Sequence, residues 1–577
     1  MERRVLLAIF LCFLVVYTWQ TLVVKPVPKP ASAPASEGGG GEVKSSTVLP
    51  PVAVKTNAPK PGPAIPVASP LVSEVSDREV RVETRDVIAV FTNRGARLKS
   101  WRLKRYLDQT NAPLELVAND LMDQPLPFSL STDDPVITAA LNSGLYVVKS
   151  VPSAEATQSA PTDLSFEYSD TSGLHAVKEF HLEPTSYIVG FRSTVSANDR
   201  SLIATVHWGP AVGDMGAEAS RYIKKPEGLL FANGSVQRLD PSSVGKQAVY
   251  EGDFPLAGVD DHYFMTAALS TGSVKVRYQP LSIPAANGAK DATRDLMSFA
   301  IEPSGSGAPM RFFAGPKDFD VLVSIDRNLV RAIDFGWFAI LVVPLLQTLK
   351  WINGVVGNYG WSIIILTVVI NAIMFPLRHK SVVSMRKMQE IQPEVKSIQD
   401  RYAKLKATDP AKQKMNQELM GLYKERGVNP ASGCVPMLLT MPVLVAFYAL
   451  LSTAIELRGA PFVGWIHDLS LHDPLYVTPV LMGITMVWQQ KIAPATGVDP
   501  AQQKMMMFMP IVFTFMFLWA PAGVAVYWLM SNLWGIGQQY LTTYMIGPPI
   551  IRTVRPAAER QVKRVGAGKT EAAARES

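Results

Sequence analysis

Long apolar runs at both ends of the chain enclose a middle section in which apolar and polar residues alternate over short stretches. Between 78 and 320, runs such as Val87 to Phe91 and Ser186 to Phe191 are separated by turns rich in Gly, Asn, Asp and Pro. This alternation is typical of antiparallel strands that bury one face. The pattern predicts an all-β sandwich domain over 76–325.

Apolar windows long enough to cross a bilayer lie on both sides of this domain, since a span needs about 20 residues. The first, at 1–24, follows Arg3 and Arg4 and predicts an N-terminal transmembrane anchor. A cleaved signal peptide is the alternative, with Ala31-Ser32-Ala33 as its cleavage site. The other windows lie within 359–545, at about 359–378, 430–452, 474–491, 505–520 and 522–545. The predicted fold class is an α-helical polytopic membrane core of six transmembrane helices, five of them forming one core, plus an all-β sandwich domain.

The segment 25–75, between the anchor and the β domain, contains eleven prolines and the run Gly38 to Gly41. Such a composition cannot bury a core and predicts a linker. The whole chain has 577 residues, 48% of them hydrophobic. This length favours several domains, and the clustering of the apolar residues favours a membrane protein.

The charges of the segments between the apolar windows predict their orientation. The loop 379–429 carries eleven Lys and Arg against six Asp and Glu, and the tail 546–577 carries seven against three Glu. The loop 453–473 has one Arg against three acidic residues. Positive loops stay on the cytoplasmic side, so 379–429, the basic tail and both termini are predicted to be cytoplasmic. A further span within 332–349 would move every later loop to the opposite side of the membrane and place the basic loop 379–429 outside. The segment 326–350 is therefore predicted to be an interfacial amphipathic helix.

The basic loop 379–429 contains a heptad pattern and predicts a helical hairpin. Apolar residues recur at spacings of three and four from Met388 to Leu405, and a second stripe follows at Met415, Leu419 and Leu422. Pro393 predicts a kink or a new helix start. Its basic residues either stay solvated or contact lipid headgroups or a partner; the candidates are Arg386, Lys387, Lys396, Arg401, Lys404 and Lys406.

Polar residues lie inside several of the predicted spans, where they are costly. They either form hydrogen bonds between helices or line a water-containing cavity, and their spread over several spans favours the cavity. Thr367 and Asn371 share one helix face, and Tyr527 and Ser531 share another. The candidate groove residues are Thr367, Asn371, Arg378, Thr440, Gln489, Tyr527, Trp528, Ser531 and Asn532.

The sequence contains no recognisable catalytic or metal-binding constellation. Cys12 and Cys434 are far apart, and the cluster Asp260-Asp261-His262 is predicted to be a surface turn. The run Gly566 to Thr570 ends like a phosphate-binding loop but lacks its first Gly and a preceding strand. We therefore expect no enzyme activity, no cofactor, no metal and no specific nucleic-acid site.

A series of short motifs in the C-terminal half resembles the YidC family of membrane protein insertases, which bacteria share with mitochondria and chloroplasts. In chain order they are Trp361-Ser-Ile-Ile-Ile, Met374-Phe-Pro376, Asn429-Pro430, Gly433-Cys-Val-Pro436, Trp465-Ile-His-Asp468-Leu-Ser, Phe508-Met-Pro510, Pro521-Ala-Gly523, Tyr527-Trp528 and Ser531-Asn532. The N-terminal anchor and the large β domain resemble the Gram-negative type.

The resemblance implies a protein of the bacterial inner membrane with its β domain in the periplasm. Its core would form a hydrophilic groove open to the cytoplasm and to lipid. The implied partners are nascent membrane proteins, the Sec translocon, the ribosome and targeting factors, and membrane lipids. Two residues depart from the family pattern: Asn371 stands where relatives often have a groove arginine, and Thr440 where they commonly have Gln.

Two other classes of protein remain as alternatives. A solute channel or transporter would also have several spans, but the sequence shows no inverted repeat. A membrane-anchored periplasmic carbohydrate-binding protein would need only one span. Ion or solute flux in proteoliposomes would favour the channel over the insertase.

Overall fold

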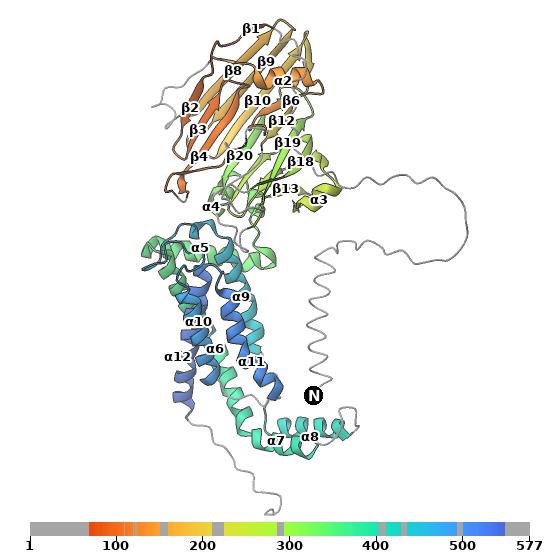
Figure 1. The fold of residues 1–577 in the computed structure, drawn as a ribbon. Coiled ribbons are helices and arrows are strands. Elements are labelled where there is room, and N and C mark those ends of the chain that lie inside the picture. Colours follow the sequence, from red (N-terminus) through yellow and green to blue (C-terminus); the bar gives the residue numbers. More distant parts are fainter. Residues whose placement is uncertain are drawn as a thin grey trace, which may run out of the picture. The chain divides into compact units, whose positions relative to one another are not determined.

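The computed structural model describes residues 69–108, 110–118, 121, 124–149, 160–209, 224–284, 293–402, 411–428, 435–492 and 500–547 (Figure 1). The predicted anchor 1–24, most of the linker 25–75 and the tail from 548 lie outside these residues. The described residues divide into two compact units. One is formed by 386–428, and the other by 69–385 together with 435–547.

Three antiparallel sheets form the β domain, coloured red to green in Figure 1. The largest has the order β1-β8-β9-β10-β20-β17-β16-β13-β14, with β7 on β8 and β11 on β10. Its strands are β1 Pro70–Val72, β7 Val147–Val148, β8 Thr162–Asp170, β9 Leu174–Leu182, β10 Ile188–Ala197, β11 Arg200–Leu202, β13 Glu227–Ala232, β14 Ser235–Leu239, β16 Leu256–Asp260, β17 Phe264–Leu269 and β20 Met310–Pro316.

The two smaller sheets have the orders β15-β18-β19-β12-β6 and β2-β3-β4-β5. The strands of the first are β6 Ser129–Ser131, β12 Thr205–Trp208, β15 Val249–Asp253, β18 Ser273–Pro284 and β19 Thr293–Pro303. Those of the second are β2 Glu79–Glu83, β3 Val87–Thr92, β4 Arg97–Leu107 and β5 Pro113–Glu115. Two short helices, α2 (Pro135–Ser143) and α3 (Pro241–Lys246), join strands of this domain.

Aromatic side chains hold both small sheets against the large one. Phe91 of β3 lies 4.7 Å from Phe180 of β9, measured between ring centroids. Trp208 of β12 stacks on Phe312 of β20 at 5.6 Å. Phe128, just before β6, contacts both of these large-sheet rings. Buried residues alternate with more exposed ones along β8, as the sequence pattern requires. The predicted all-β sandwich is confirmed.

The segment Asp260 to His262 joins β16 to β17 and is a turn, but it is not a surface turn, so that prediction was wrong. Asp260 is fully buried and pairs with Lys317 at 3.0 Å. His262 Nε2 donates to the backbone oxygen of Ser452 at 2.7 Å, and its Nδ1 accepts from the backbone N–H of Lys224 at 3.3 Å. Burial raises the pKa of Asp261 to about 7 and lowers the pKa of His262 to about 4.

The helices outside the hairpin that follow the strands are α4 Phe319–Ile325, α5 Ala339–Val356, α6 Tyr359–Glu390, α9 Val435–Thr453, α10 Val477–Ile492, α11 Pro500–Phe517 and α12 Ala522–Ile546. Helices α6 and α9 to α12 overlap the five windows predicted within 359–545, whereas α4 and α5 lie outside those windows. Helix α6 continues through Pro376 and runs beyond the predicted end of its span at 378. In the described part of the chain, α5 and α6 are long and apolar enough to cross a membrane.

Helix α5 covers only the second half of the segment predicted to be an interfacial helix, 326–350, and extends to Val356; the first half contains short 3-10 turns at Leu329–Ala332 and Gly336–Phe338. Its buried residues Val342, Leu346, Leu349 and Ile352 follow one face, as expected for a helix packed on one side. The opposite face exposes large apolar side chains such as Trp351. Helix α5 is also long and apolar enough to cross a membrane. Its position along the membrane surface therefore stays a prediction.

The smaller unit, 386–428, contains a helical hairpin formed by α7 (Gln392–Arg401) and α8 (Ala411–Glu425). Pro393 lies in the first turn of α7, which confirms the predicted new helix start. The predicted heptad seam is also confirmed. Its buried cluster is Ile391, Val395, Ile398, Met415, Leu419 and Val428.

Candidate functional site

Three helices of the core enclose a pocket of about 160 Å³. Helix α6 contributes four lining residues, α9 two and α12 three. The lining consists of Ile370, Asn371, Met374, Arg378, Val443, Leu444, Tyr527, Trp528 and Ser531. The structure thus brings together five of the nine predicted groove residues: Asn371, Arg378, Tyr527, Trp528 and Ser531.

The α6 side of the pocket carries an unused hydrogen-bond acceptor. Asn371 is buried, and its Nδ2 donates to the backbone oxygen of Thr367 at 2.8 Å. Its Oδ1 is buried and accepts no hydrogen bond from the described residues. Thr367 lies one turn earlier, outside the lining, and its hydroxyl donates to the backbone oxygen of Ile363 at 2.6 Å. The Asn371 oxygen is therefore a buried acceptor without a hydrogen-bond donor among the described residues.

Arg378 gives the pocket its charge. It lies seven residues after Asn371, about two helical turns further along α6. Among the described lining residues, it is the only charged one. The α6 wall thus combines a neutral amide with a guanidinium further along the helix.

The α12 side is aromatic. Tyr527 stacks on Phe447 of α9, with ring centroids 4.4 Å apart and planes 10° apart. Trp528 packs against Phe513 and Phe517 of α11. Phe447 and four lining residues were not predicted: Ile370, Met374, Val443 and Leu444. Nothing in the sequence separates these residues from ordinary apolar residues of a span.

Thr367, Gln489 and Asn532 were also predicted to line the groove, but they are not among the described residues that line this pocket. Asn532 is buried, and its Nδ2 donates to Thr485 Oγ1 of α10 at 3.2 Å. Gln489 of α10 packs against Gly535, where an added Cβ would lie 2.3 Å from Gln489 Nε2. Both residues therefore serve the packing of α10 against α12. The side chain of Thr440 lies outside the described residues.

The predicted basic residues of the hairpin differ in their surroundings. Arg401 pairs with Glu418 across the two helices at 3.0 Å. Lys387 and Lys396 are exposed, whereas Arg386 is buried. Lys404 and Lys406 lie outside the described residues. Arg426, which was not singled out, pairs with Glu394 at 2.8 Å.

In the part of the chain that the structure describes, no group of three or more His, Cys, Asp or Glu residues could hold a metal ion. The chemistry available at the pocket is hydrogen bonding and charge attraction. A largely apolar pocket that also contains an amide, a guanidinium and a hydroxyl, together with helices that are long and apolar enough to cross a membrane, is typical of an integral membrane protein.

Comparison with known proteins specifies the class further. The family model described as "60Kd inner membrane protein" matches residues 351–547, and the one described as "YidC periplasmic domain" matches 79–348. A membrane protein insertase YidC of Syntrophus aciditrophicus is 33% identical over 559 residues, with 94% of this chain and 99% of the relative covered. One of Geobacter metallireducens is 35% identical over 548 residues, with 93% and 98% covered.

Among solved structures, a YidC insertase crystal structure is similar at 17% identity and a TM-score of 0.34, covering 83% of this chain and 95% of that one. A galactose mutarotase-like protein from Lactobacillus casei is similar at 11% identity and a TM-score of 0.26, covering 41% and 100%.

The chain belongs to the YidC family of membrane protein insertases. It is an inner-membrane protein with a periplasmic β domain. Its family is not an enzyme family.

Proposed function

We propose that this insertase guides the polar flank of a nascent membrane protein through the pocket between α6, α9 and α12. The physical problem is that a charged residue at the centre of a bilayer costs about 2.5–3.5 kcal/mol. A pocket with hydrogen-bonding groups and water lowers that cost over part of the path. The apolar segment of the client then moves sideways into lipid, where its burial is favourable.

The observation that carries this proposal is the grouping of Asn371, Arg378 and Ser531 on the wall of one pocket. Members of the family often have a groove arginine at the position that matches Asn371, and this chain has an amide there. Arg378 lies on the same wall, so the pocket keeps a cation at a different depth along α6. Client segments with acidic flanks would therefore meet amide and hydroxyl groups at one level and the guanidinium about two turns away.

The orientation follows from the charge distribution. In our proposal the hairpin 379–429, the tail 546–577 and both termini face the cytoplasm, as the positive-inside rule requires. The spans are the predicted six, including the anchor 1–24. The interfacial placement of α5 agrees with its Lys350, which pairs with Asp320 at 2.6 Å and Glu456 at 3.1 Å. Asp318 is a third partner at 3.7 Å, and a lysine shared by three carboxylates fits a polar layer better than the middle of a bilayer.

The hairpin is the proposed contact for ribosomes, targeting factors and lipid headgroups, because its exposed basic side chains include Lys387 and Lys396. The Sec translocon is a proposed partner for clients with several spans.

The proposal is tested by replacing Asn371 with Leu and Thr367 with Val in the full chain, followed by insertion assays in reconstituted vesicles. Insertion of a client with a charged flank should fall about tenfold, equivalent to ~1.4 kcal/mol. Insertion of a matched client with an uncharged flank should change less than twofold. The single variant T367V is the control, because Thr367 bonds to its own helix and does not line the pocket. Equal losses for both clients would overturn the groove mechanism.

A further inference from the structure

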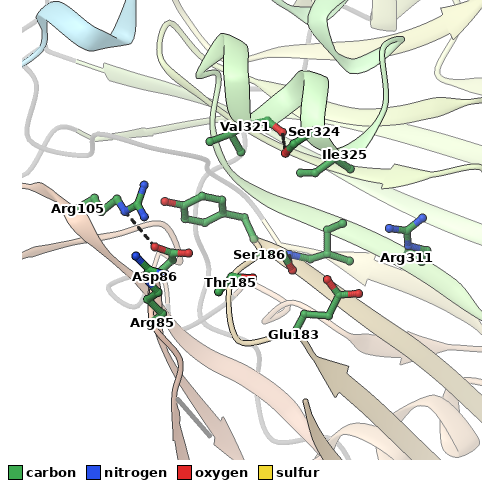
Figure 2. Close-up of a pocket in the computed structure, with 12 residues that line it drawn as sticks. Arg85, Asp86, Arg105, Glu183, Thr185, Ser186, Arg311, Val321, Ser324 and Ile325 are labelled. Carbon is green, nitrogen blue, oxygen red and sulfur yellow. Dashed lines mark hydrogen bonds and ion pairs between the residues drawn. The ribbon is translucent and has the colours of Figure 1, made fainter. Parts of the chain in front are cut away.

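A second pocket, of about 360 Å³, lies in the β domain and has no part in the proposed groove (Figure 2). Its walls come from the β2–β3 turn, β4, the β9–β10 turn, β20 and α4. Five of its lining residues are charged: Arg85, Asp86, Arg105, Glu183 and Arg311. A concave site with convergent polar groups is the usual form of a small-ligand site.

One end of this pocket carries an unbalanced positive charge. Figure 2 shows Arg85, Asp86 and Arg105 together at that end, away from Arg311. Arg105 Nε lies 3.0 Å from Asp86 Oδ1, so these two charges offset each other. Arg85 is exposed and has no ion-pair partner among the described residues. Its guanidinium therefore remains available to an anion, and its planar fork suits a phosphate or carboxylate.

The same end also offers a buried acceptor. The Asp86 side chain is only 6% exposed. Its Oδ1 accepts no hydrogen bond of acceptable geometry from the described residues, although it lies close to Arg105. Buried carboxylate oxygens ordinarily accept hydrogen bonds. Because Oδ1 is buried beside Arg105, a ligand hydroxyl would reach this carboxylate through the part of Asp86 that lines the pocket. The pocket therefore suits a ligand that has both an anionic group and a hydroxyl group.

Hydroxyl side chains continue this polar surface toward the other end. Thr185 and Ser186 lie between the Arg85 end and Arg311, and Ser324 of α4 lies on the opposite wall (Figure 2). Beside Ser324, α4 contributes the apolar Val321 and Ile325. The mixture is typical of sites for small polyol derivatives rather than for apolar ligands.

We propose that this pocket binds a hydroxylated phosphate ester, with the phosphate on Arg85 and a ligand hydroxyl donating to Asp86. Glycerol phosphate has this chemistry, and it occurs both as a free solute and in the headgroups of phospholipids. The proposal is independent of the insertase mechanism, because none of these residues lines the pocket between α6, α9 and α12.

The test uses the full chain in detergent micelles and isothermal titration calorimetry with sn-glycerol 3-phosphate. Saturable binding is expected, and inorganic phosphate or glycerol alone should bind at least tenfold more weakly. Arg85→Gln should weaken the binding of glycerol 3-phosphate at least tenfold. The matched control is Arg81→Gln, because Arg81 is also exposed but pairs with Glu83 outside the pocket. It should change the affinity less than twofold.

Absence of saturable binding to the unmodified chain would overturn the proposal. So would an equal loss in the two arginine variants, which would indicate general charge attraction. The source of the ligand is decided in nanodiscs of phosphatidylcholine with or without phosphatidylglycerol. A lower apparent affinity for glycerol 3-phosphate in the phosphatidylglycerol discs would show competition by the lipid headgroup. An equal affinity in both discs would assign the site to a soluble ligand.

Discussion

Buried polar side chains are used differently in the β domain and on the α6 wall of the groove pocket. In the β domain they link segments that are far apart in sequence. Lys178 is fully buried and donates to the backbone oxygens of Gly95 and Phe128, at 2.6 and 2.8 Å. In the core, Thr367 and Asn371 each donate to a backbone oxygen four residues earlier in their own helix.

Polar groups of the first kind hold distant parts of the fold together. Polar groups of the second kind do not join α6 to another helix. A bond within one helix does not hold that helix to its neighbours. Motion of α6 relative to α9 would leave these two hydrogen bonds intact, whereas Gln538 Nε2 of α12 donates to the backbone oxygen of Phe375 in α6 at 3.4 Å and links those two helices. The β domain has no such freedom where Lys178 joins its sheets, which suits a rigid support.

The largest expected effect is the loss of the buried pair between Lys317 and Asp260. Lys317→Met should lower the free energy of unfolding of the β domain by about 3–5 kcal/mol, because it leaves the Asp260 carboxylate buried without its partner. Denaturant unfolding of the full chain, followed by β-sheet circular dichroism, measures this. Lys275→Met is the control: Lys275 is half-exposed and pairs loosely with two acids, so a change under 1 kcal/mol is expected. Similar losses of unfolding free energy in both variants would mean that the buried ion pair contributes no more to stability than the exposed ones.

The next effect is a pH dependence with opposite signs at neighbouring residues. The pKa of His262 is lowered to about 4, so its contribution to stability is lost as pH falls from about 6.5 to 4. The pKa of Asp261 is raised to about 7, so the folded state binds more protons, and stability falls as pH rises from about 4 to 7.

At about 1.4 kcal/mol per pKa unit, these shifts correspond to at most ~3 kcal/mol for His262 and ~4 kcal/mol for Asp261. The variant Asp261→Asn should therefore become more stable as pH rises from 4 to 6.5, and His262→Gln should become less stable over that range. Thermal unfolding at several pH values tests the signs. Identical slopes in the two variants would show that burial does not control these groups.

The smallest effect compares two polar residues within the core. Asn532→Leu removes a hydrogen bond between α12 and α10 and should destabilise the core by about 0.6–2 kcal/mol. Thr367→Val removes a bond within α6 and should cost less than about 0.5 kcal/mol. Thermal unfolding in detergent, followed by helical circular dichroism, resolves the two. A larger loss for the Thr367 variant would mean that intrahelical bonds also hold the core together.

Local patterns in the sequence predicted local structure well. The hairpin seam followed from apolar spacings of three and four, because Ile391, Val395 and Ile398 share one helix face whatever lies beyond it. The stripe of Tyr527 and Ser531 followed from the same periodicity, and both residues line the groove pocket.

Long-range pairing could not be predicted in this way. Strand β20 lies between β10 and β17 in the large sheet, although more than a hundred residues separate β10 from β20 in sequence. Alternation predicts a strand but not its neighbours. Asn532 follows Ser531 directly, yet it points to α10, because adjacent residues on a helix differ by about 100°. The cluster at Asp260 was misjudged because its partners, Lys317 and Ser452, are distant in sequence.

The α7–α8 hairpin has an apolar seam of its own, and this has an evolutionary consequence. Because its cluster is formed by residues from within 391–428, its outward side chains can be replaced without disturbing the seam. Selection can thus exchange the basic residues of the hairpin for others and adapt it to a different partner. The groove pocket between α6, α9 and α12 would be inherited unchanged.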